Sequence, residues 1–244
     1  MANDIRDIRT FQRIEKKYLI TKDEMSTLLK SLSDLLTEDQ YAHGTITSLY
    51  LDTPTRALVR RSIEGGPYKE KLRLRGYGNA TEDSSVYLEL KKKYKGIVYK
   101  RRAAISLDEA KEYFDGKRPL EDSQIGRELE YAMKLYGMPM PYIAIIYDRD
   151  AYVVDSEDEI RITFDKNVRY RTEDLFSAFG GDGELILPED KIIMEIKTEG
   201  AMPLRISHLL DEMKIFPTSF SKYGRAYLNE LEKEKRGQKN GIFV

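Results

Sequence analysis

Basic side chains occur at every second position in one ten-residue segment, YKEKLRLRGY at 68–77. If this segment is extended, one of its faces carries only cations, because side chains alternate between the two faces of a strand. Arginine offers a rigid fork that matches phosphate oxygens, and lysine adds a point charge. The row is therefore suited to binding a phosphorylated anion, and its members are Lys69, Lys71, Arg73 and Arg75.

The same alternation of charged residues recurs in five other segments. A row of charges on a single strand is most often the solvated face of an antiparallel sheet. Repetition on this many strands lowers the weight of that interpretation and also suits a barrel with a polar bore. Two like charges about 4 Å apart repel by roughly 4 kcal/mol at an effective dielectric of about 20, so crowded cations predict a polyanionic ligand. The five segments are Arg13/Glu15/Lys17, Glu89/Lys91/Lys93, Lys100/Arg102, Arg161/Thr163/Asp165 and Glu195/Lys197.

A few carboxylates lie among these cations and are candidate metal ligands. A hard divalent ion such as Mg²⁺ is typically held by one or two carboxylates together with substrate phosphates. Glu195, on an otherwise apolar strand, is the best single candidate, and Glu15 and Glu89 are two more. In the alternative, which the sequence leaves open, Glu195 is only the ion-pair partner of a nearby cation.

The composition argues against several other classes of protein. Lys and Arg (41) balance Asp and Glu (42), so a general nucleic-acid binder is not expected. The absence of cysteine excludes a thiolate nucleophile and a Cys-ligated metal. No P-loop and no G-x-G-x-x-G loop occurs, and two histidines are too few for a His-ligated metal centre. No apolar run is long enough for a membrane segment and no signal peptide is found, so the expected location is cytoplasmic.

The elements that must position these side chains are mostly strands. We expect a single domain over residues 1–244, with a core at 11–232 and a flexible tail at 233–244. Strands are predicted at 11–20, 45–52, 57–63, 68–77, 86–94, 97–105, 142–155, 159–168 and 192–198. Helices are predicted after a Thr21–Glu24 capping box, at 107–115, 122–136 and 203–214, and from an N-cap at Ser221 to near Arg236.

Taken in order, these motifs resemble the VTC-type polyphosphate polymerase domain. That domain belongs to the triphosphate tunnel metalloenzyme superfamily, which also contains the CYTH proteins. Each motif alone is weakly specific, and the ordered set from residue 11 to about 230 is fairly specific. Besides the segments above, the set includes S-x-Y-x-D at Ser48, Tyr50 and Asp52, Y-x-R-x-A at Tyr147, Arg149 and Ala151, and F-S-K-Y at Phe220 to Tyr223.

The resemblance implies an α+β fold, with a closed antiparallel eight-stranded β-barrel, or tunnel, and helices packed on its outside. It implies Mg²⁺ or Mn²⁺ as cofactor, and ATP or another triphosphate together with polyphosphate as ligands. The implied reaction transfers the γ-phosphate of ATP to a growing polyphosphate chain. Such a transfer needs mainly alignment and charge neutralisation, so a site without a nucleophilic side chain is sufficient. Protein partners are left open.

The resemblance and the charge pattern together predict a set of site residues. Ser221 enters it because the unpaired N–H groups at the start of the last helix would attract an anion. The predicted catalytic residues are Arg73, Arg75, Lys91, Arg149, Arg161 and Lys222. The predicted substrate-binding residues are Lys17, Lys71, Lys100, Arg102, Lys197 and Ser221. The predicted metal ligands are Glu195, Glu15 and Glu89.

One departure from the superfamily bears on the reaction. CYTH-type triphosphatases carry E-x-E-x-K near the start, and here the first of these positions is Arg13. Fewer carboxylates are then available for metal, which favours the polymerase-like branch over simple hydrolysis. The alternatives are a metal-dependent triphosphatase and a non-catalytic module that senses polyphosphate or a nucleotide.

Overall fold

The computed structural model describes residues 14–95, 97–154 and 160–240. Arg13, the start of the predicted first strand and the last four residues of the predicted tail lie outside this part of the chain. The strands are β1 (Ile14–Thr21), β2 (Leu36–Asp52), β3 (Tyr68–Tyr77), β4 (Ser85–Tyr94), β5 (Ile97–Ser106), β6 (Met140–Val154), β7 (Ile160–Arg171), β8 (Glu184–Leu185) and β9 (Lys191–Thr198). The helices are α1 (Lys22–Ser31), α2 (Ala57–Glu64), α3 (Leu107–Phe114), α4 (Gln124–Leu135), α5 (Leu204–Glu212) and α6 (Lys222–Asn240), with a 3₁₀ turn η1 (Leu175–Gly180).

A single antiparallel sheet organises the chain. Its strand order is β1-β9-β7-β6-β2-β3-β4-β5, and the short β8 pairs with β7. The α+β class is confirmed, but the prediction of a closed eight-stranded barrel is wrong. The sheet has nine strands, and β1 and β5 stand at its two ends without pairing to each other in the described residues. The alternation of charges reports only which side chains share a face, and an open curved sheet satisfies it as well as a barrel does.

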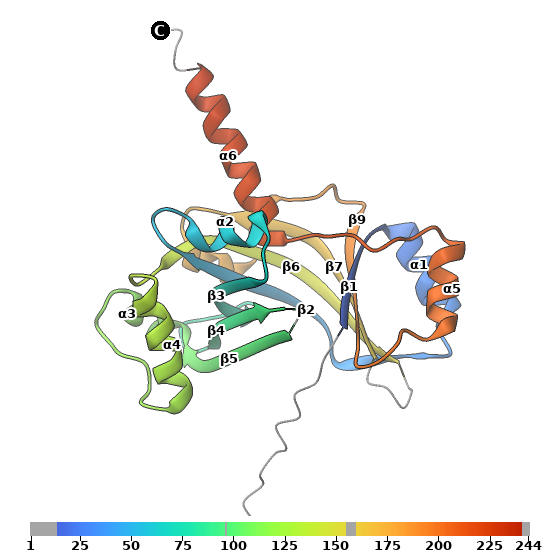
Figure 1. Cartoon of the computed structure of the whole chain (residues 1–244), viewed down its shortest axis with the longest axis horizontal. Helices are drawn as coiled ribbons and strands as arrows, with labels where there is room; N and C mark the ends of the chain where they lie inside the picture. The colour runs from blue at the N-terminus through green and yellow to red at the C-terminus, as the bar shows by residue number, and fades with distance from the viewer. Residues whose placement is uncertain (1–13, 96, 155–159, 241–244) are drawn as a thin grey trace, which may run out of the picture.

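The outer face of the sheet is apolar at both ends, and helices cover it there (Figure 1). At one end α1 and α5 pack on β1, β7 and β9, around fully buried residues such as Ile20 and Phe164. At the other end α3 and α4 pack on β3, β4 and β5, around residues such as Leu72 and Leu88. Burial of these two apolar layers fixes which face of each strand points outward, because a one-residue slip would turn every side chain over.

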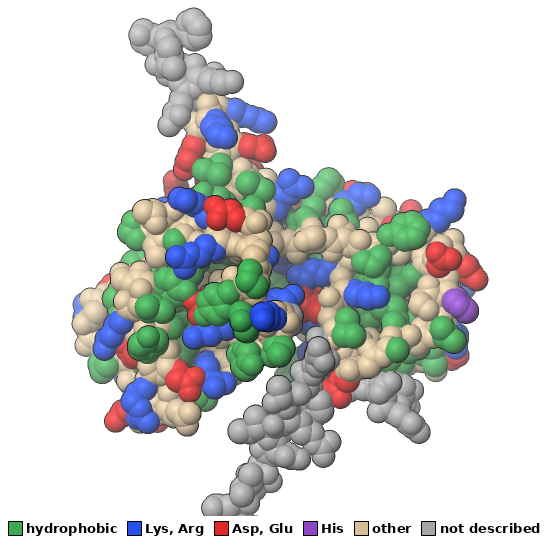
Figure 2. All heavy atoms as spheres, in the orientation of Figure 1, with side chains coloured by type: hydrophobic (Ala, Val, Ile, Leu, Met, Phe, Trp, Pro, Cys, Tyr) green, Lys and Arg blue, Asp and Glu red, His purple; other side chains and the backbone are tan. Residues whose placement is uncertain are grey.

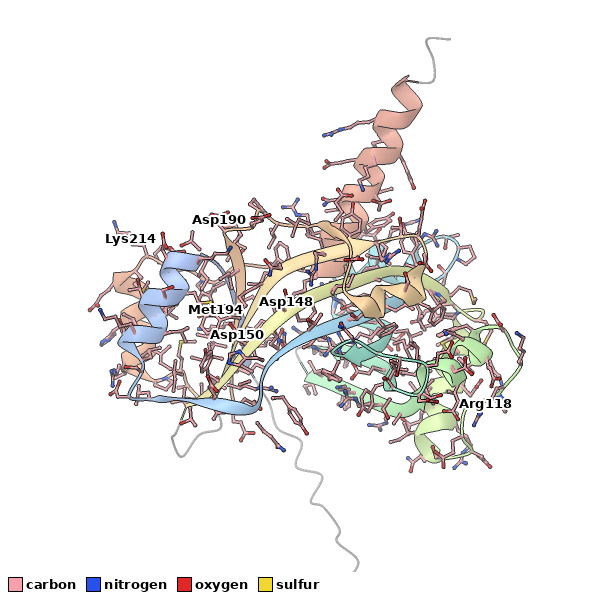
Figure 3. The ribbon with its side chains drawn as sticks, turned by 180° about the vertical axis from the view of Figure 1, so that it is seen from behind. Arg118, Asp148, Asp150, Asp190, Met194 and Lys214 are labelled. Carbon is pink, nitrogen blue, oxygen red and sulfur yellow. The ribbon has the colours of Figure 1, made fainter. Side chains whose placement is uncertain are left out.

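The middle of the outer face is polar and separates the two apolar layers. Figure 3 shows Asp148 and Asp150 there on β6, whereas Met194 of β9 lies beside α1 and α5. Asp150 accepts hydrogen bonds from Lys166 at 2.5 Å and pairs with His43 at 2.8 Å. Both carboxylates already have partners on the neighbouring strands β2 and β7, so these contacts hold adjacent strands of the sheet together.

Three predicted elements differ clearly from those observed. β2 begins at Leu36, well before the predicted strand 45–52. Residues 57–63, predicted as a strand, form α2, because the Asp52 carboxylate accepts hydrogen bonds from the N–H groups of Leu58 and Val59 and so caps the helix start. The last helix, predicted to end near Arg236, continues to Asn240 and projects from the sheet (Figure 1). Its helical backbone therefore includes most of the predicted tail.

The N-terminus of α1 was predicted correctly. Thr21 accepts from the N–H of Glu24 at 3.1 Å, and the Glu24 carboxylate accepts from the N–H of Thr21 at 2.6 Å. This capping box ends β1 and turns the chain onto the outer face. In the described residues no helix is both long and apolar enough to cross a bilayer.

Candidate functional site

The concave face of the sheet carries the predicted charged residues. The sheet curls strongly, since Lys91 Nζ of β4 lies 4.0 Å from Glu15 Oε2 of β1, although five strands separate β4 from β1 in the sheet. Figure 2 shows Lys and Arg side chains, with acidic ones beside them, where the two ends of the sheet face each other. Alternation places the charges on this face because the apolar residues between them are held under the outer helices.

Asp165 of β7 is the most deeply buried charge of this face. Its carboxylate accepts a bidentate pair from Arg149, with Nε to Oδ1 at 2.6 Å and Nη2 to Oδ2 at 2.8 Å, and it also contacts Lys222 Nζ. Burial raises the pKa of Asp165, but Lys222 and Arg149 outweigh burial and lower it. Burial lowers the pKa of Lys222, but Asp165 and Glu195 outweigh it, so the ammonium stays charged. Asp165 thus joins β6 and β7 to the first residue of α6.

Glu195 of β9 lies beside this triad and has looser ion pairs. Its Oε1 is 3.5 Å from Lys17 Nζ and 3.7 Å from Lys222 Nζ, and its Oε2 is 3.4 Å from Lys197 Nζ. Burial raises the pKa of Glu195, but Lys222, Lys17 and Lys197 lower it to well below its usual value. An ionised carboxylate at these distances keeps lone pairs available for a further ligand.

Glu89 of β4 is bound much more tightly. Its carboxylate receives Arg73 at 2.7 and 2.8 Å, Lys100 at 2.8 Å and Arg102 at 3.1 Å. Burial raises the pKa of Glu89, but the surrounding cations, Arg73 and Arg75 foremost, lower it to about 2. Glu89 therefore balances the cations of β3 and β5.

Arg75 and Lys71 of β3 have a different environment. Arg75 donates to Ser48 Oγ and to Tyr147 Oη, both at 3.2 Å, and Lys71 Nζ lies 3.4 Å from Ser221 Oγ. Within the described residues neither has an ion pair with a carboxylate. Hydroxyl groups orient these two cations, and Arg75 acts on Glu89 only at longer range, so both can bind an external anion in direct contact.

The start of α6 enters the concave face and meets strands from both ends of the sheet. Ser221 Oγ accepts from the N–H of Gly224 at 3.1 Å, which confirms the predicted N-cap. Lys17 Nζ of β1 donates to the carbonyl of Phe220 at 3.3 Å, and Lys222 lies 4.7 Å from the centroid of the Tyr147 ring. The F-S-K-Y segment therefore connects β1, β3, β6 and β7.

The structure brings most of the predicted residues into these connected clusters. Arg161 lies apart: it shares the concave face, but its Nε pairs with Asp39 at 2.8 Å and its side chain is 39% exposed. Asp165, Tyr147 and Tyr50 were missed as site residues. The R-x-T-x-D and Y-x-R-x-A spacings place Asp165 and Tyr147 on the same face as their cations, and only tertiary contacts show that Asp165 binds Arg149 and Lys222.

The carboxylates fit a metal that is held partly by its substrate. Among the described residues, no group of three or more His, Cys, Asp or Glu is placed to hold an ion. Glu15 and Glu195, in contrast, lie near each other, each 3.5 Å from Lys17 Nζ. Burial raises the pKa of Glu15, as does Glu195, but Lys91 and Lys17 outweigh them and keep it ionised. One or two carboxylates completed by phosphate oxygens and water are a usual Mg²⁺ site.

The fold and the site together define a protein whose antiparallel sheet curls around a concave face rich in Lys and Arg. The chain belongs to the VTC domain family, whose model matches residues 12–229. It is also similar to the vacuolar transporter chaperone complex subunit 4 of Schizosaccharomyces pombe, with 26% identity over 160 residues. That match covers 56% of this chain and 22% of the yeast protein.

Two of the solved structures that match this chain have a similar fold. A putative adenylate cyclase from Bacillus halodurans superimposes with a TM-score of 0.51 and 13% identity. A putative adenylyl cyclase from Hippeastrum, described as having a dominant triphosphatase activity, superimposes with a TM-score of 0.50 and 17% identity. Each match covers 86% of this chain and 93% of the other. At these identities the likeness shows the fold alone.

Proposed function

We propose that this protein transfers the γ-phosphate of ATP, or of another nucleoside triphosphate, to a polyphosphate chain bound on the concave face. The observation that carries the proposal is the excess of cations there: in the described part of the chain, the eleven predicted basic residues outnumber the carboxylates that pair with them, which are Glu15, Asp39, Glu89, Asp165 and Glu195. Membership of the VTC domain family supports the polyphosphate part of the proposal. Substrate phosphates would neutralise the charge that the carboxylates leave uncompensated.

The chain's own residues would act mainly by alignment. Arg75 and Lys71 are free of carboxylates in the described structure and would contact phosphate directly. Arg149 and Lys222 are held in place by Asp165, so they present fixed positive charge without rearrangement. Preorganised charge of this kind stabilises a phosphoryl group in transfer, and the terminal phosphate of the growing chain would be the nucleophile.

Glu195 and Glu15 would hold the Mg²⁺ or Mn²⁺, and Glu89 would not. The three cations around Glu89 lie within 3.1 Å and occupy its oxygens, whereas those around Glu195 lie at 3.4 Å or more. A bound metal would neutralise charge on the triphosphate. Residues 1–244 would act as one catalytic domain.

The decisive experiment is to incubate the pure protein with ATP and Mn²⁺ or Mg²⁺ and to separate the products on a polyphosphate gel. The proposal expects a long polymer and loss of the nucleotide γ-phosphate, both of which depend on metal. Arg75→Ala is the matched variant, and it should lose polymer formation. Free orthophosphate as the sole product would refute the polymerase reaction, and stabilisation by ATP without turnover would indicate a sensor module instead.

A metal-dependent triphosphatase is the second candidate. The observation that favours it is the proximity of Glu15 and Glu195, because two carboxylates that share a metal can also position an attacking water. Phosphate release from tripolyphosphate, measured in parallel with the gel, distinguishes the two reactions.

A further inference from the structure

Tyr50 lies near the C-terminal end of β2 on the concave face, directly opposite Arg73 of β3. Its hydroxyl accepts a hydrogen bond from Arg73 Nη1 at 3.3 Å, and its side chain is buried. Arg73 uses Nε and Nη2 to bind Glu89, at 2.8 and 2.7 Å. The guanidinium is therefore held from two sides, by a carboxylate and by a phenol.

The ring of Tyr50 stacks on Tyr223, the second residue of α6. The ring centroids are 4.3 Å apart and the planes differ by 9°. Tyr223 donates its hydroxyl proton to Asp52 Oδ2 at 2.6 Å, and Asp52 also caps α2. Because Lys222 directly precedes Tyr223, the stack fixes the start of α6 relative to β3.

We propose that Tyr50 is a positioning residue of the anion site: its hydroxyl holds Arg73 toward the phosphate chain, and its stack on Tyr223 keeps Lys222 in register with Arg73. The inference rests on the proposed binding of a triphosphate or polyphosphate to the concave face. Tyr50 would then join Tyr147 as an aromatic residue of this site.

The surroundings of the phenol give this role a measurable signature. Burial raises the pKa of Tyr50, but Arg73, Lys71 and Arg75 of β3 outweigh burial and lower it to about 7. Above that pH the phenolate supplies a negative charge that a bound polyanion would otherwise supply. Other titratable groups on the elements packed around it include Asp52 of β2, Glu89 of β4, Tyr147 of β6, and Tyr223 and Tyr227 of α6.

The test compares Tyr50→Phe with the wild-type protein by calorimetric titration with tripolyphosphate in the absence of metal. At about pH 6 the variant should bind at least roughly tenfold more weakly, the scale of one hydrogen bond to a charged group. At about pH 8.5 the difference should shrink to less than about threefold, because only the wild-type protein then carries a phenolate that repels the ligand. The comparison at equal pH cancels titration of the ligand itself.

Tyr223→Phe is the matched control, because it keeps the stacked ring and removes only the bond to Asp52. It should melt at a lower temperature but retain the wild-type change of affinity with pH. If Tyr50→Phe lowers the affinity by the same factor at both pH values, Tyr50 is merely structural and the proposal is overturned. If the wild-type protein does not bind tripolyphosphate at either pH, the proposed function fails instead.

A titration of the free protein tests Tyr50 without any ligand. Ultraviolet absorbance of tyrosinate should show one tyrosine ionising at about pH 7 in the wild-type protein. Tyr50→Phe, shown to be folded by circular dichroism, should lack that step. A wild-type protein without a tyrosine that ionises near neutral pH would refute the pH signature assigned to Tyr50, whatever the ligand.

Discussion

Replacing Asp165 by asparagine should destabilise the protein more than any other single charge removal on the concave face. The carboxylate is fully buried and binds two cations that are themselves buried, with Arg149 13% and Lys222 11% exposed. Asparagine keeps the shape but leaves these cations without their main partner. Removing one side of a buried ion pair costs about 3–5 kcal/mol, and we expect the lower end because Glu195 remains 3.7 Å from Lys222.

The measurement is denaturant unfolding without ligand, with Asp150→Asn as the matched control. Asp150 lies on the opposite face, and its partners Lys166 and His43 can turn toward water once the carboxylate is neutral. The Asp150 side chain is itself only 10% exposed, but Lys166 and His43 are 31% and 59% exposed, so its removal should cost clearly less than that of Asp165. If Asp165→Asn unfolds within about 0.5 kcal/mol of the wild-type protein, Asp165 does not hold Arg149 and Lys222 as argued.

The pH dependence of the same variant gives a second check. Because the folded pKa of Asp165 is lowered, its stabilisation is present above the unfolded value of about 3.8 and is lost as the pH falls through the folded value. The difference between the wild-type protein and Asp165→Asn should therefore be constant at neutral pH and shrink in acid below about pH 4. A difference that grows as the pH falls would contradict the assigned sign.

Three other predictions concern the charges that face the substrate. Arg75→Gln should leave the free energy of unfolding of the ligand-free protein unchanged or slightly raised, because it relieves repulsion among cations. It should weaken tripolyphosphate binding by at least about tenfold in calorimetry. A large loss of stability would show that Arg75 is structural. Glu195→Gln should abolish metal-dependent turnover of ATP while nucleotide binding persists, and full activity would remove Glu195 from the metal site. Arg161→Ala should lower the affinity for tripolyphosphate less than Arg75→Gln does, because Arg161 is partly exposed and already paired with Asp39. An equal or larger loss of affinity would place Arg161 inside the site.

The sequence by itself determined which side chains share a face. Alternation is a local property of a strand, so the run from Lys69 to Arg75 and the pair Glu195 and Lys197 could be read without knowing which strands are neighbours. Composition likewise excluded chemistry that needs cysteine. Strand 57–63 was predicted wrongly, because the cap that makes it a helix comes from Asp52 through contacts that alternation does not record.

Only the tertiary structure decided how the charges are distributed among partners. Arg73 and Arg75 are two residues apart on one strand with the same orientation, yet Arg73 binds Glu89 and Arg75 finds only hydroxyl groups. Long-range contacts also bring Asp165 of β7 to Lys222 at the start of α6. They leave β1 and β5 unpaired with each other in the described chain. The physical reason is that strand order and sheet curvature set these distances, and both depend on packing between segments far apart in the sequence.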